Sequence, residues 1–171
     1  THGSNVLGTV QDIGEIGGLL RDEGIFFIVD GAQTAGQIPV DLGSMPLDVF
    51  AFTGHKALFG IPGIGGFYIR DPGLVDPMRQ GGTGVNSAYP YHEEEMPSRF
   101  EAGTHNYPGI ASLAAGIRDP SRWRAPHHQA RAAVRLALDE RPVRRRRRPA
   151  PIPAGAPVVI LLADDVIFLK V

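Results

Sequence analysis

The sequence predicts an α/β domain with a mostly parallel sheet flanked by helices, and two apolar runs support this prediction. Residues Ile25 to Val29 are continuously apolar, as expected for a strand covered on both faces of a parallel sheet. A second run, Asp48 to Thr53 (DVFAFT), is rich in Val and Phe and has the length of a buried strand. The stretch between them, Thr34 to Leu47, is long enough for a crossover. Ligands are therefore expected at the carboxyl ends of these strands.

A helix is predicted before the first strand, over Asp12 to Glu23. Asp12 is the candidate N-cap, since Glu15 follows three residues later, and Gly24 is the candidate stop. Three internal glycines weaken the helix intrinsically, so packing must hold it. Its apolar residues recur at helical spacing: Ile13, Ile16, Leu19 and Leu20.

Beyond the second strand, the sequence predicts a turn, a strand and a helix. Gly60 to Gly66 is interpreted as a tight turn, because it has neither the ending of a P-loop nor dinucleotide-fold spacing. Phe67 to Arg70 is expected to form a short strand. Ala111 to Ile117 indicates a helix whose first turn lies near Pro108.

Composition restricts the classes of function. The 171 residues are 43% hydrophobic, enough for one domain with a core. There is no cysteine, which excludes disulfides, thiolate metal sites and a persulfide-carrying nucleophile within this sequence. Six histidines without cysteine do not indicate a metal site. No apolar run has the length of a membrane span or the features of a signal peptide, so a cytoplasmic setting is expected.

Two ionisable residues follow the predicted strands. Lys56, in the stretch AFTGHKALFG, is one of only two lysines. Apolar neighbours lower the pKa of a lysine, and the unprotonated amine can condense with an aldehyde. Asp30 closes the first strand, where a carboxylate is costly unless it meets a cation or a donor. The alternatives are a solvated loop lysine and a cap or turn aspartate.

Four blocks in order carry a resemblance to a known family. They read VDGAQ, FTGHK, GIGGFYIR and RFEAGT. This pattern resembles the class V aminotransferase and cysteine desulfurase group of enzymes that use pyridoxal 5'-phosphate (PLP). The resemblance covers residues 1–117 and implies an internal fragment of the large domain of a fold-type-I PLP transferase.

The resemblance implies a role for three residues on the ring side of the cofactor. Lys56 would form the internal aldimine with PLP. Asp30 would pair with the protonated pyridine nitrogen, so that the ring withdraws electrons from the substrate carbanion. Gln33 would hydrogen-bond the 3-oxygen of the ring, although an exposed loop glutamine is the alternative.

Four further residues are implied in the same way. Thr53 and His55 would contact the phosphate, Asn5 in HGSNVLG would lie beside the cofactor, and Thr104 would reach a phosphate in the neighbouring subunit. The resemblance therefore implies a homodimer. The alternatives are an ordinary strand threonine, a structural histidine, a turn residue for Asn5 and a helix N-cap for Thr104.

The implied activity is a PLP-dependent transformation of an amino acid. The first candidate reaction is cysteine desulfurase-like sulfur transfer from cysteine. The next candidate is transamination or a related β-elimination. Family parts on both sides and a cysteine nucleophile are absent from this sequence, so the fragment is expected to have weak or no turnover alone. The alternative is a non-catalytic remnant that acts at most as a binding module.

Residues 118–171 differ in composition from the first part. Residues 1–117 contain 13 acidic and 5 basic residues, whereas 118–171 contain 5 acidic and 12 basic ones. This Arg/Pro/Ala-rich stretch is interpreted as an irregular, low-order tail. We hypothesise a change of reading frame near Arg118, which peptides spanning Ile117–Arg118 in an intact frame would contradict. Asp119-Pro120 would end the preceding helix.

Three segments of this tail have separate interpretations. His127 to Glu140 is predicted to form a short helix with a mostly alanine face. Arg144 to Arg148 would bind nucleic acid as an alternative function, although no aromatic interleaving supports such binding. Val158 to Val171 is strongly apolar and is expected to be a strand or a docking tail.

Overall fold

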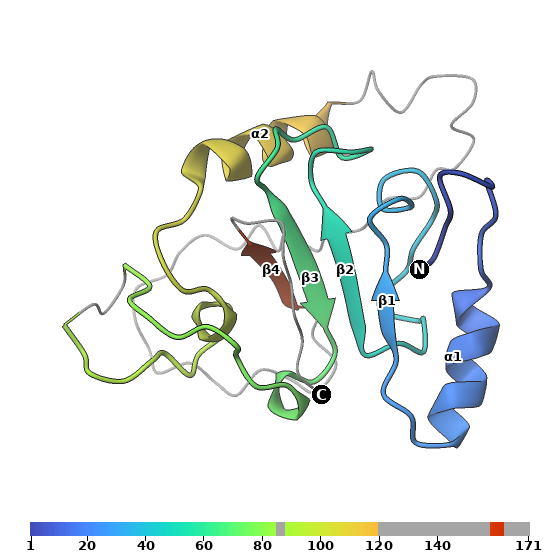
Figure 1. Cartoon of the computed structure of the whole chain (residues 1–171), viewed down its shortest axis with the longest axis horizontal. Helices are drawn as coiled ribbons and strands as arrows, with labels where there is room; N and C mark the ends of the chain where they lie inside the picture. Colours follow the sequence, from blue (N-terminus) through green and yellow to red (C-terminus); the bar gives the residue numbers. More distant parts are fainter. Residues whose placement is uncertain (85–87, 120–157, 163–171) are drawn as a thin grey trace.

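Four strands form one sheet in the order β1-β2-β3-β4 (Figure 1). The computed structural model describes residues 1–84 and 88–119, together with the backbone of 158–162. The α/β class is confirmed, since helices flank a sheet that contains a parallel pair. The elements are α1 (Ile13–Asp22), β1 (Ile28–Asp30), β2 (Val49–Thr53), β3 (Gly65–Ile69), η1 (Pro72–Leu74), η2 (Ser98–Phe100), α2 (Tyr107–Arg118) and β4 (Val158–Leu162).

The sheet is mixed in this part of the chain. β1 and β2 are parallel, with Val29 paired to Phe50, whereas β2 with β3 and β3 with β4 are antiparallel. The connection between β1 and β2 includes the predicted crossover over residues 34–47. The shorter loop 54–64 returns the chain directly to the sheet, which produces an antiparallel neighbour.

Helix α1 has the predicted caps at both ends. The Asp12 carboxylate accepts a hydrogen bond from the Glu15 N–H at 2.9 Å, as an N-cap does. Gly24 has a φ of 66°, and its N–H bonds the Arg21 carbonyl, while the Ile25 N–H bonds the carbonyl of Leu20. These two hydrogen bonds form a Schellman motif, which needs a residue that tolerates positive φ.

Strand β1 is shorter than the apolar run that predicts it. The Phe27 N–H donates to the Asp48 carboxylate at 2.7 Å instead of continuing a regular strand. Ile25 belongs to the ending of α1, so the strand begins only at Ile28. The chain therefore uses the first half of this run to turn from α1 into the sheet.

Strand β3 begins earlier than predicted. Gly65 and Gly66 belong to the strand, not to the turn before it. A Cβ on Gly65 would lie 2.8 Å from the Phe52 carbonyl oxygen, so this close approach requires glycine. The glycine-rich stretch is thus partly turn and partly strand.

The two faces of the sheet carry separate apolar cores. The helix-side core contains residues from α1, α2 and alternate strand positions, whereas the loop-side core is covered by the segment with η1 and η2. The buried members of the helix-side core are Ile13, Val29, Ala35, Val40, Leu47, Phe50, Leu58, Ile64, Tyr68 and Leu113. The buried members of the loop-side core are Val49, Phe67, Ile69 and Val75, with Phe26, Ala51, Met96 and Phe100 packed against them.

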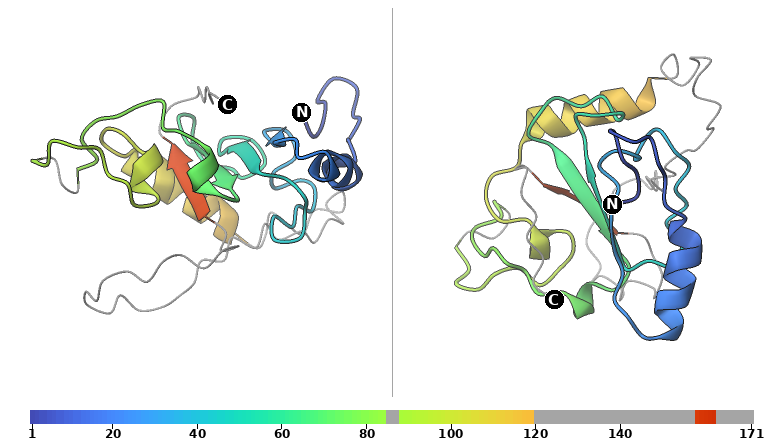
Figure 2. Two further views of the ribbon diagram at one scale, coloured as in Figure 1. Left: turned by 90° about the horizontal axis from the view of Figure 1, so that it is seen from below. Right: turned by 45° about the vertical axis from the view of Figure 1, so that its right-hand side comes forward.

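Helix α2 agrees with the prediction and starts four residues earlier than the Ala111 boundary. Asn106 caps it by accepting from the Gly109 N–H at 3.0 Å, and its amide donates to the Gly63 carbonyl at 3.0 Å. The helix ends at Arg118, before Asp119. The views in Figure 2 show α1 and α2 apart, with α1 alongside β1.

Part of the predicted tail lies outside the described residues. This applies to the helix expected over His127 to Glu140 and to the arginine run Arg144 to Arg148. β4 is the described portion of the apolar segment Val158 to Val171, and it pairs with β3 along its backbone. Among the helices of the described ranges, none has the length and hydropathy needed to cross a membrane.

Candidate functional site

The carboxyl ends of β1 and β2 meet at one edge of the sheet, where both arrows point in Figure 1. Asp30 ends β1 and is paired in register with Ala51 of β2. Ala51 packs in the loop-side core, whereas Val29 and Phe50 pack in the helix-side core. Because side chains alternate along a strand, Asp30 and Thr53 project from the same face as Ala51. Two predicted site residues thus share one edge and one face.

The Asp30 carboxylate is exposed and bonded locally. Its Oδ1 accepts from the Ala32 N–H at 2.9 Å, and its Oδ2 accepts from the Thr1 hydroxyl at 3.5 Å. The first contact is that of a turn aspartate, so the local part of that alternative is present. The carboxylate keeps lone pairs that face solvent, where a cationic partner can approach it.

Gly31 sets the path of the chain directly after Asp30. Its N–H donates to the Ala51 carbonyl at 2.8 Å, which continues the parallel pairing by one bond. A Cβ at this position would lie 2.0 Å from Cζ of Phe50. The glycine therefore lets the turn lie against the core ring, and this places the Asp30 carboxylate at the strand edge.

Lys56 lies in the loop over residues 54–64 that joins β2 to β3. The Gly54 N–H donates to the Ile64 carbonyl at 2.8 Å and closes the base of the loop. The Lys56 carbonyl accepts from the Phe59 N–H at 3.0 Å, which forms a tight turn. Its side chain is half-buried and makes no hydrogen bond or ion pair with the residues that the structure describes. The amine is therefore available for a ligand.

Helix α2 supports this loop from the helix side. The Ser112 hydroxyl oxygen accepts from the Ile61 N–H at 3.0 Å. A Cβ on Gly116 would lie 2.3 Å from the Leu58 carbonyl oxygen, so the helix and the loop approach as closely as backbones can. The loop that carries the lysine is thus fixed at its base and along its length.

Thr53 and His55 form a pair next to Lys56. The Thr53 Oγ1 and the His55 Nδ1 are 2.8 Å apart, within hydrogen-bonding distance. The His55 ring is exposed and Thr53 is half-buried. A hydroxyl and an imidazole together offer donors to an anion at this edge. The same bond would also satisfy a structural histidine, so the phosphate role of the pair stays a prediction.

Asn5 lies in a small hairpin that is attached to the end of β1. The Ser4 hydroxyl accepts from the Val6 and Leu7 N–H groups at 3.3 and 3.2 Å, so Asn5 is exposed in a tight turn. This position matches the turn alternative and equally leaves the amide free to face a ligand. The His2 N–H donates to the Asp30 carbonyl at 2.8 Å, which brings the hairpin to the site edge.

Gln33 and Thr104 have different relations to this edge. Gln33 is half-buried in the turn that follows β1. Thr104 is exposed, and within the described ranges no hydrogen bond connects it to the strand edge. Its neighbour Gly103 donates to the Gly82 carbonyl at 2.8 Å. The alternative of a Thr104 helix cap is wrong, because Asn106 caps α2.

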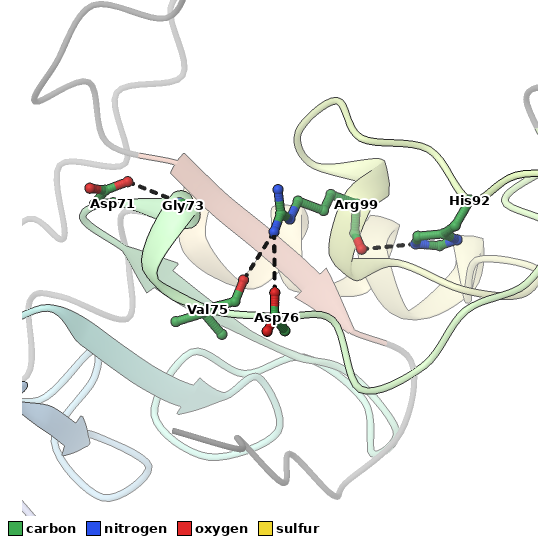
Figure 3. A network of polar contacts seen from close by, with 6 residues as sticks. All are labelled: Asp71, Gly73, Val75, Asp76, His92 and Arg99. Carbon is green, nitrogen blue, oxygen red and sulfur yellow. Dashed lines mark hydrogen bonds and ion pairs between the residues drawn. The ribbon is translucent and has the colours of Figure 1, made fainter.

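Arg99 and His92 hold the segment that leads to Thr104, as Figure 3 shows. The Arg99 guanidinium donates to the Val75 carbonyl at 3.2 Å and lies 3.9 Å from the Asp76 carboxylate. It also lies over the Phe100 ring, 5.5 Å from the ring centroid. The His92 Nε2 is 2.8 Å from the Arg99 carbonyl oxygen. Side-chain contacts therefore position this segment, together with the backbone bond from Gly103 to Gly82 and without regular strand pairing.

Sequence reasoning missed two buried polar residues at the site. His2 and Thr34 are 3% and 2% exposed, and the His2 Nδ1 and the Thr34 Oγ1 are 2.7 Å apart. Burial lowers the pKa of His2 below its usual 6.5, and the positive Thr1 amino group lowers it further. Thr34 comes directly after VDGAQ, and His2 opens HGSNVLG, but no spacing pattern connects the two. In the described ranges, no cluster of His, Asp and Glu side chains can hold a metal ion.

A comparison with protein-family models finds one match for this chain. The model described as "Aminotransferase class-V" matches residues 1–146. The match includes every predicted site residue and extends past the end of α2.

Curated relatives and solved structures agree with this match. A "Probable cysteine desulfurase" of Pyrococcus abyssi is 40% identical over 121 residues, which is 68% of this chain and 30% of the relative. An apo cysteine desulfurase of Thermococcus onnurineus has a TM-score of 0.61 at 38% identity and covers 71% of this chain and 32% of its own. A cystine C-S lyase in complex with its product, cysteine persulfide, has a TM-score of 0.55 at 35% identity, covering 64% and 31%. The chain spans about 30% of the length of the relative from Pyrococcus.

Proposed function

Since this chain belongs to the class V aminotransferase family, we propose that it carries the cofactor-anchoring part of a PLP-dependent enzyme acting on a sulfur amino acid. The observation that carries the proposal is that Asp30 and Thr53 share one face at the strand edge from which the Lys56 loop continues. Cysteine is the first substrate to test, because the relative from Pyrococcus is named a cysteine desulfurase.

The donor set at this edge fits PLP. The cofactor has a basic ring nitrogen, an aldehyde and a phosphate, which need three different partners. These groups are matched by an exposed carboxylate at Asp30, by the Lys56 amine, which has no partner among the described residues, and by the hydroxyl–imidazole pair of Thr53 and His55.

Each of these residues has a task in this proposal. When bound, PLP supplies a ring that accepts electrons from the substrate carbon. The Asp30 carboxylate would hold the ring nitrogen in its protonated form. The Lys56 amine would hold the cofactor at rest and would move a proton at the substrate Cα. Thr53 and His55 would bind the phosphate, and Gln33 would bind the ring oxygen.

Two further residues complete the proposed cofactor contacts. Asn5 lies beside the cofactor, in the hairpin that His2 attaches to β1. Thr104 binds a phosphate in a second copy of the chain, so the active assembly is a homodimer. The lack of any hydrogen bond from Thr104 to the strand edge within the described ranges is compatible with a role toward a second copy.

The likeness to a cystine C-S lyase supports a second reaction type. Sulfur transfer to a protein thiol needs a cysteine, and none of the 171 residues is one. Elimination at a C–S bond needs no protein thiol when the sulfur leaves on a small molecule. The cystine C-S lyase, whose product is cysteine persulfide, belongs to this type. Lyase-like cleavage of cystine is therefore the second candidate, and comparing cysteine with cystine as substrates separates the two.

Turnover by this chain alone is proposed to be weak or absent. The chain spans about 30% of the curated relative from Pyrococcus, and it supplies no cysteine. A steady-state assay with added PLP and cysteine measures this directly. Turnover comparable to that of an intact cysteine desulfurase would contradict it.

Covalent labelling tests the cofactor proposal without any need for turnover. Incubation with PLP followed by borohydride reduction and peptide mass spectrometry should label Lys56 and spare Lys170, the other lysine. Lys170→Arg should keep the label, whereas Lys56→Arg should lose it while retaining the positive charge. Equal labelling of both lysines would reject the proposed site and favour a non-catalytic remnant.

A further inference from the structure

His2 connects two parts of the site that are far apart in sequence. Its backbone N–H donates to the Asp30 carbonyl at 2.8 Å, and its carbonyl accepts from the Gln11 N–H at 2.8 Å. Its Nδ1 lies 2.7 Å from the Thr34 hydroxyl oxygen. The hairpin with Asn5 and the turn between Asp30 and Thr34 are therefore joined by both the backbone and the side chain of one residue.

Packing leaves this histidine little freedom. The side chain is 3% exposed, and its ring makes a T-shaped contact with the Phe50 ring, with 6.5 Å between the centroids. Thr34 is 2% exposed, and a Cβ on Gly3 would lie 2.6 Å from the Thr34 methyl group. The hairpin and the turn thus touch without a gap, and the imidazole–hydroxyl pair is sealed between them.

The Thr34 hydroxyl lies within hydrogen-bonding distance of two groups, the His2 Nδ1 at 2.7 Å and the Gly31 carbonyl at 3.4 Å. The bond to the ring forms with either neutral tautomer, because a hydroxyl can both donate and accept. Burial lowers the pKa of His2, which favours the neutral ring.

We propose that His2 is a positioning residue, whose bond to Thr34 holds the turn Asp30–Thr34 and so aims the Asp30 carboxylate and the Gln33 amide at the cofactor. This role rests on the proposed function, since the cofactor is what the two side chains face. The Asp30 carboxylate depends on the turn because its Oδ1 bonds the Ala32 N–H within it. Loosening the turn therefore releases the carboxylate as well.

Two matched pairs of variants separate the effect of losing the His2–Thr34 hydrogen bond from the effect of changing the packing. Thr34→Val keeps the shape and removes the hydroxyl, whereas Thr34→Ser keeps the hydroxyl. His2→Leu removes the ring nitrogens, whereas His2→Asn keeps a polar atom near the position of Nδ1. The serine and asparagine variants should resemble the wild type if the bond is what matters.

Amide hydrogen exchange of the full chain without PLP is the first readout. Exchange of the amides in the turn over residues 31–35 should rise about tenfold in Thr34→Val, the effect of losing one hydrogen bond, and should stay unchanged in Thr34→Ser. The amides of α2 serve as the internal control and should keep their protection. Unchanged exchange in the turn of Thr34→Val would overturn the inference, even if His2→Leu fails to fold.

PLP titration with borohydride labelling is the second readout. The apparent Kd for PLP should rise about tenfold in Thr34→Val, with less label on Lys56, and Thr34→Ser should restore both. If the proposed function itself is wrong, the wild-type chain will carry no label on Lys56. A labelled wild type with Thr34→Val equal to it in both readouts would reject the role of His2 alone.

Discussion

The stretch over residues 28–64 and the stretch over residues 70–104 both contain predicted site residues, but they are held in different ways. In the first, strand pairing and turn bonds fix Asp30 and Lys56 through the backbone. In the second, two short 3₁₀ turns are held by the side chains of Arg99 and Phe100. The residues proposed to react therefore depend on backbone geometry, and Thr104 depends on a few side chains.

The difference shows where each stretch is sensitive to substitution. The backbone hydrogen bonds at a strand end break only when the chain itself is displaced, because they are made by N–H and C=O groups and not by side chains. In a segment held by side chains, each substitution removes only the contacts of the side chain that it replaces. Substitutions at close backbone approaches in the first stretch should therefore cost more than substitutions of charged side chains in the second.

Gly31→Ala should have the largest effect and sharpen the comparison most. The new Cβ would meet the Phe50 ring at 2.0 Å, and overpacking of this kind lowers the free energy of unfolding by about 3 kcal/mol. Gly18→Ala is the matched control, since a Cβ there meets no atom within 4 Å and a helical alanine adds about 0.5–1 kcal/mol. Urea unfolding measures both, and a Gly31→Ala variant as stable as the wild type would contradict the close packing.

Lowering the pH should have an intermediate effect on stability through His2, which contacts the first stretch at Thr34. The folded-state pKa of His2 lies below its unfolded value of 6.5, so the unfolded chain takes up the proton first as pH falls. Stability is then fully present above 6.5 and declines below it, by at most about 1.4 kcal/mol per pH unit, until the folded pKa is reached. Burial is the larger cause of this lowered pKa, and the positive Thr1 amino group adds to it.

Unfolding free energies of the wild type and His2→Asn across this pH range test the effect. The contribution of His2 is the part of the pH slope that disappears in the variant. Identical slopes for the two proteins would show that other groups dominate the acid response.

Asp76→Asn should have the smallest effect on stability, and it tests the comparison in the stretch over residues 70–104. The carboxylate is 97% exposed and 3.9 Å from Arg99, and such surface pairs contribute less than about 0.5 kcal/mol. Arg99→Leu should cost about 1 kcal/mol, because it also removes the bond to the Val75 carbonyl. Thermal unfolding of the two variants measures the difference. A larger loss in Asp76→Asn than in Arg99→Leu would reverse our view of this segment.

The strand ends were predictable because apolar runs in the sequence mark buried strands. Continuous apolar runs located β1 and β2, and the residues after them, Asp30 and Lys56, followed directly. The start of β1 was not predictable, because the Asp48 side chain takes the N–H of Phe27. His2 and Thr34 were not predictable either, since their contact joins segments 32 positions apart and each residue alone resembles an ordinary loop residue.

Helix α2 has 12 residues, is about 18 Å long and begins two residues after His105. Its amino-terminal end is thus continuous with the segment that is proposed to meet a second subunit. Further along, Ser112 bonds the Ile61 N–H and Gly116 lies against the Leu58 carbonyl. One short helix therefore spans from the Thr104 segment to the loop that carries Lys56.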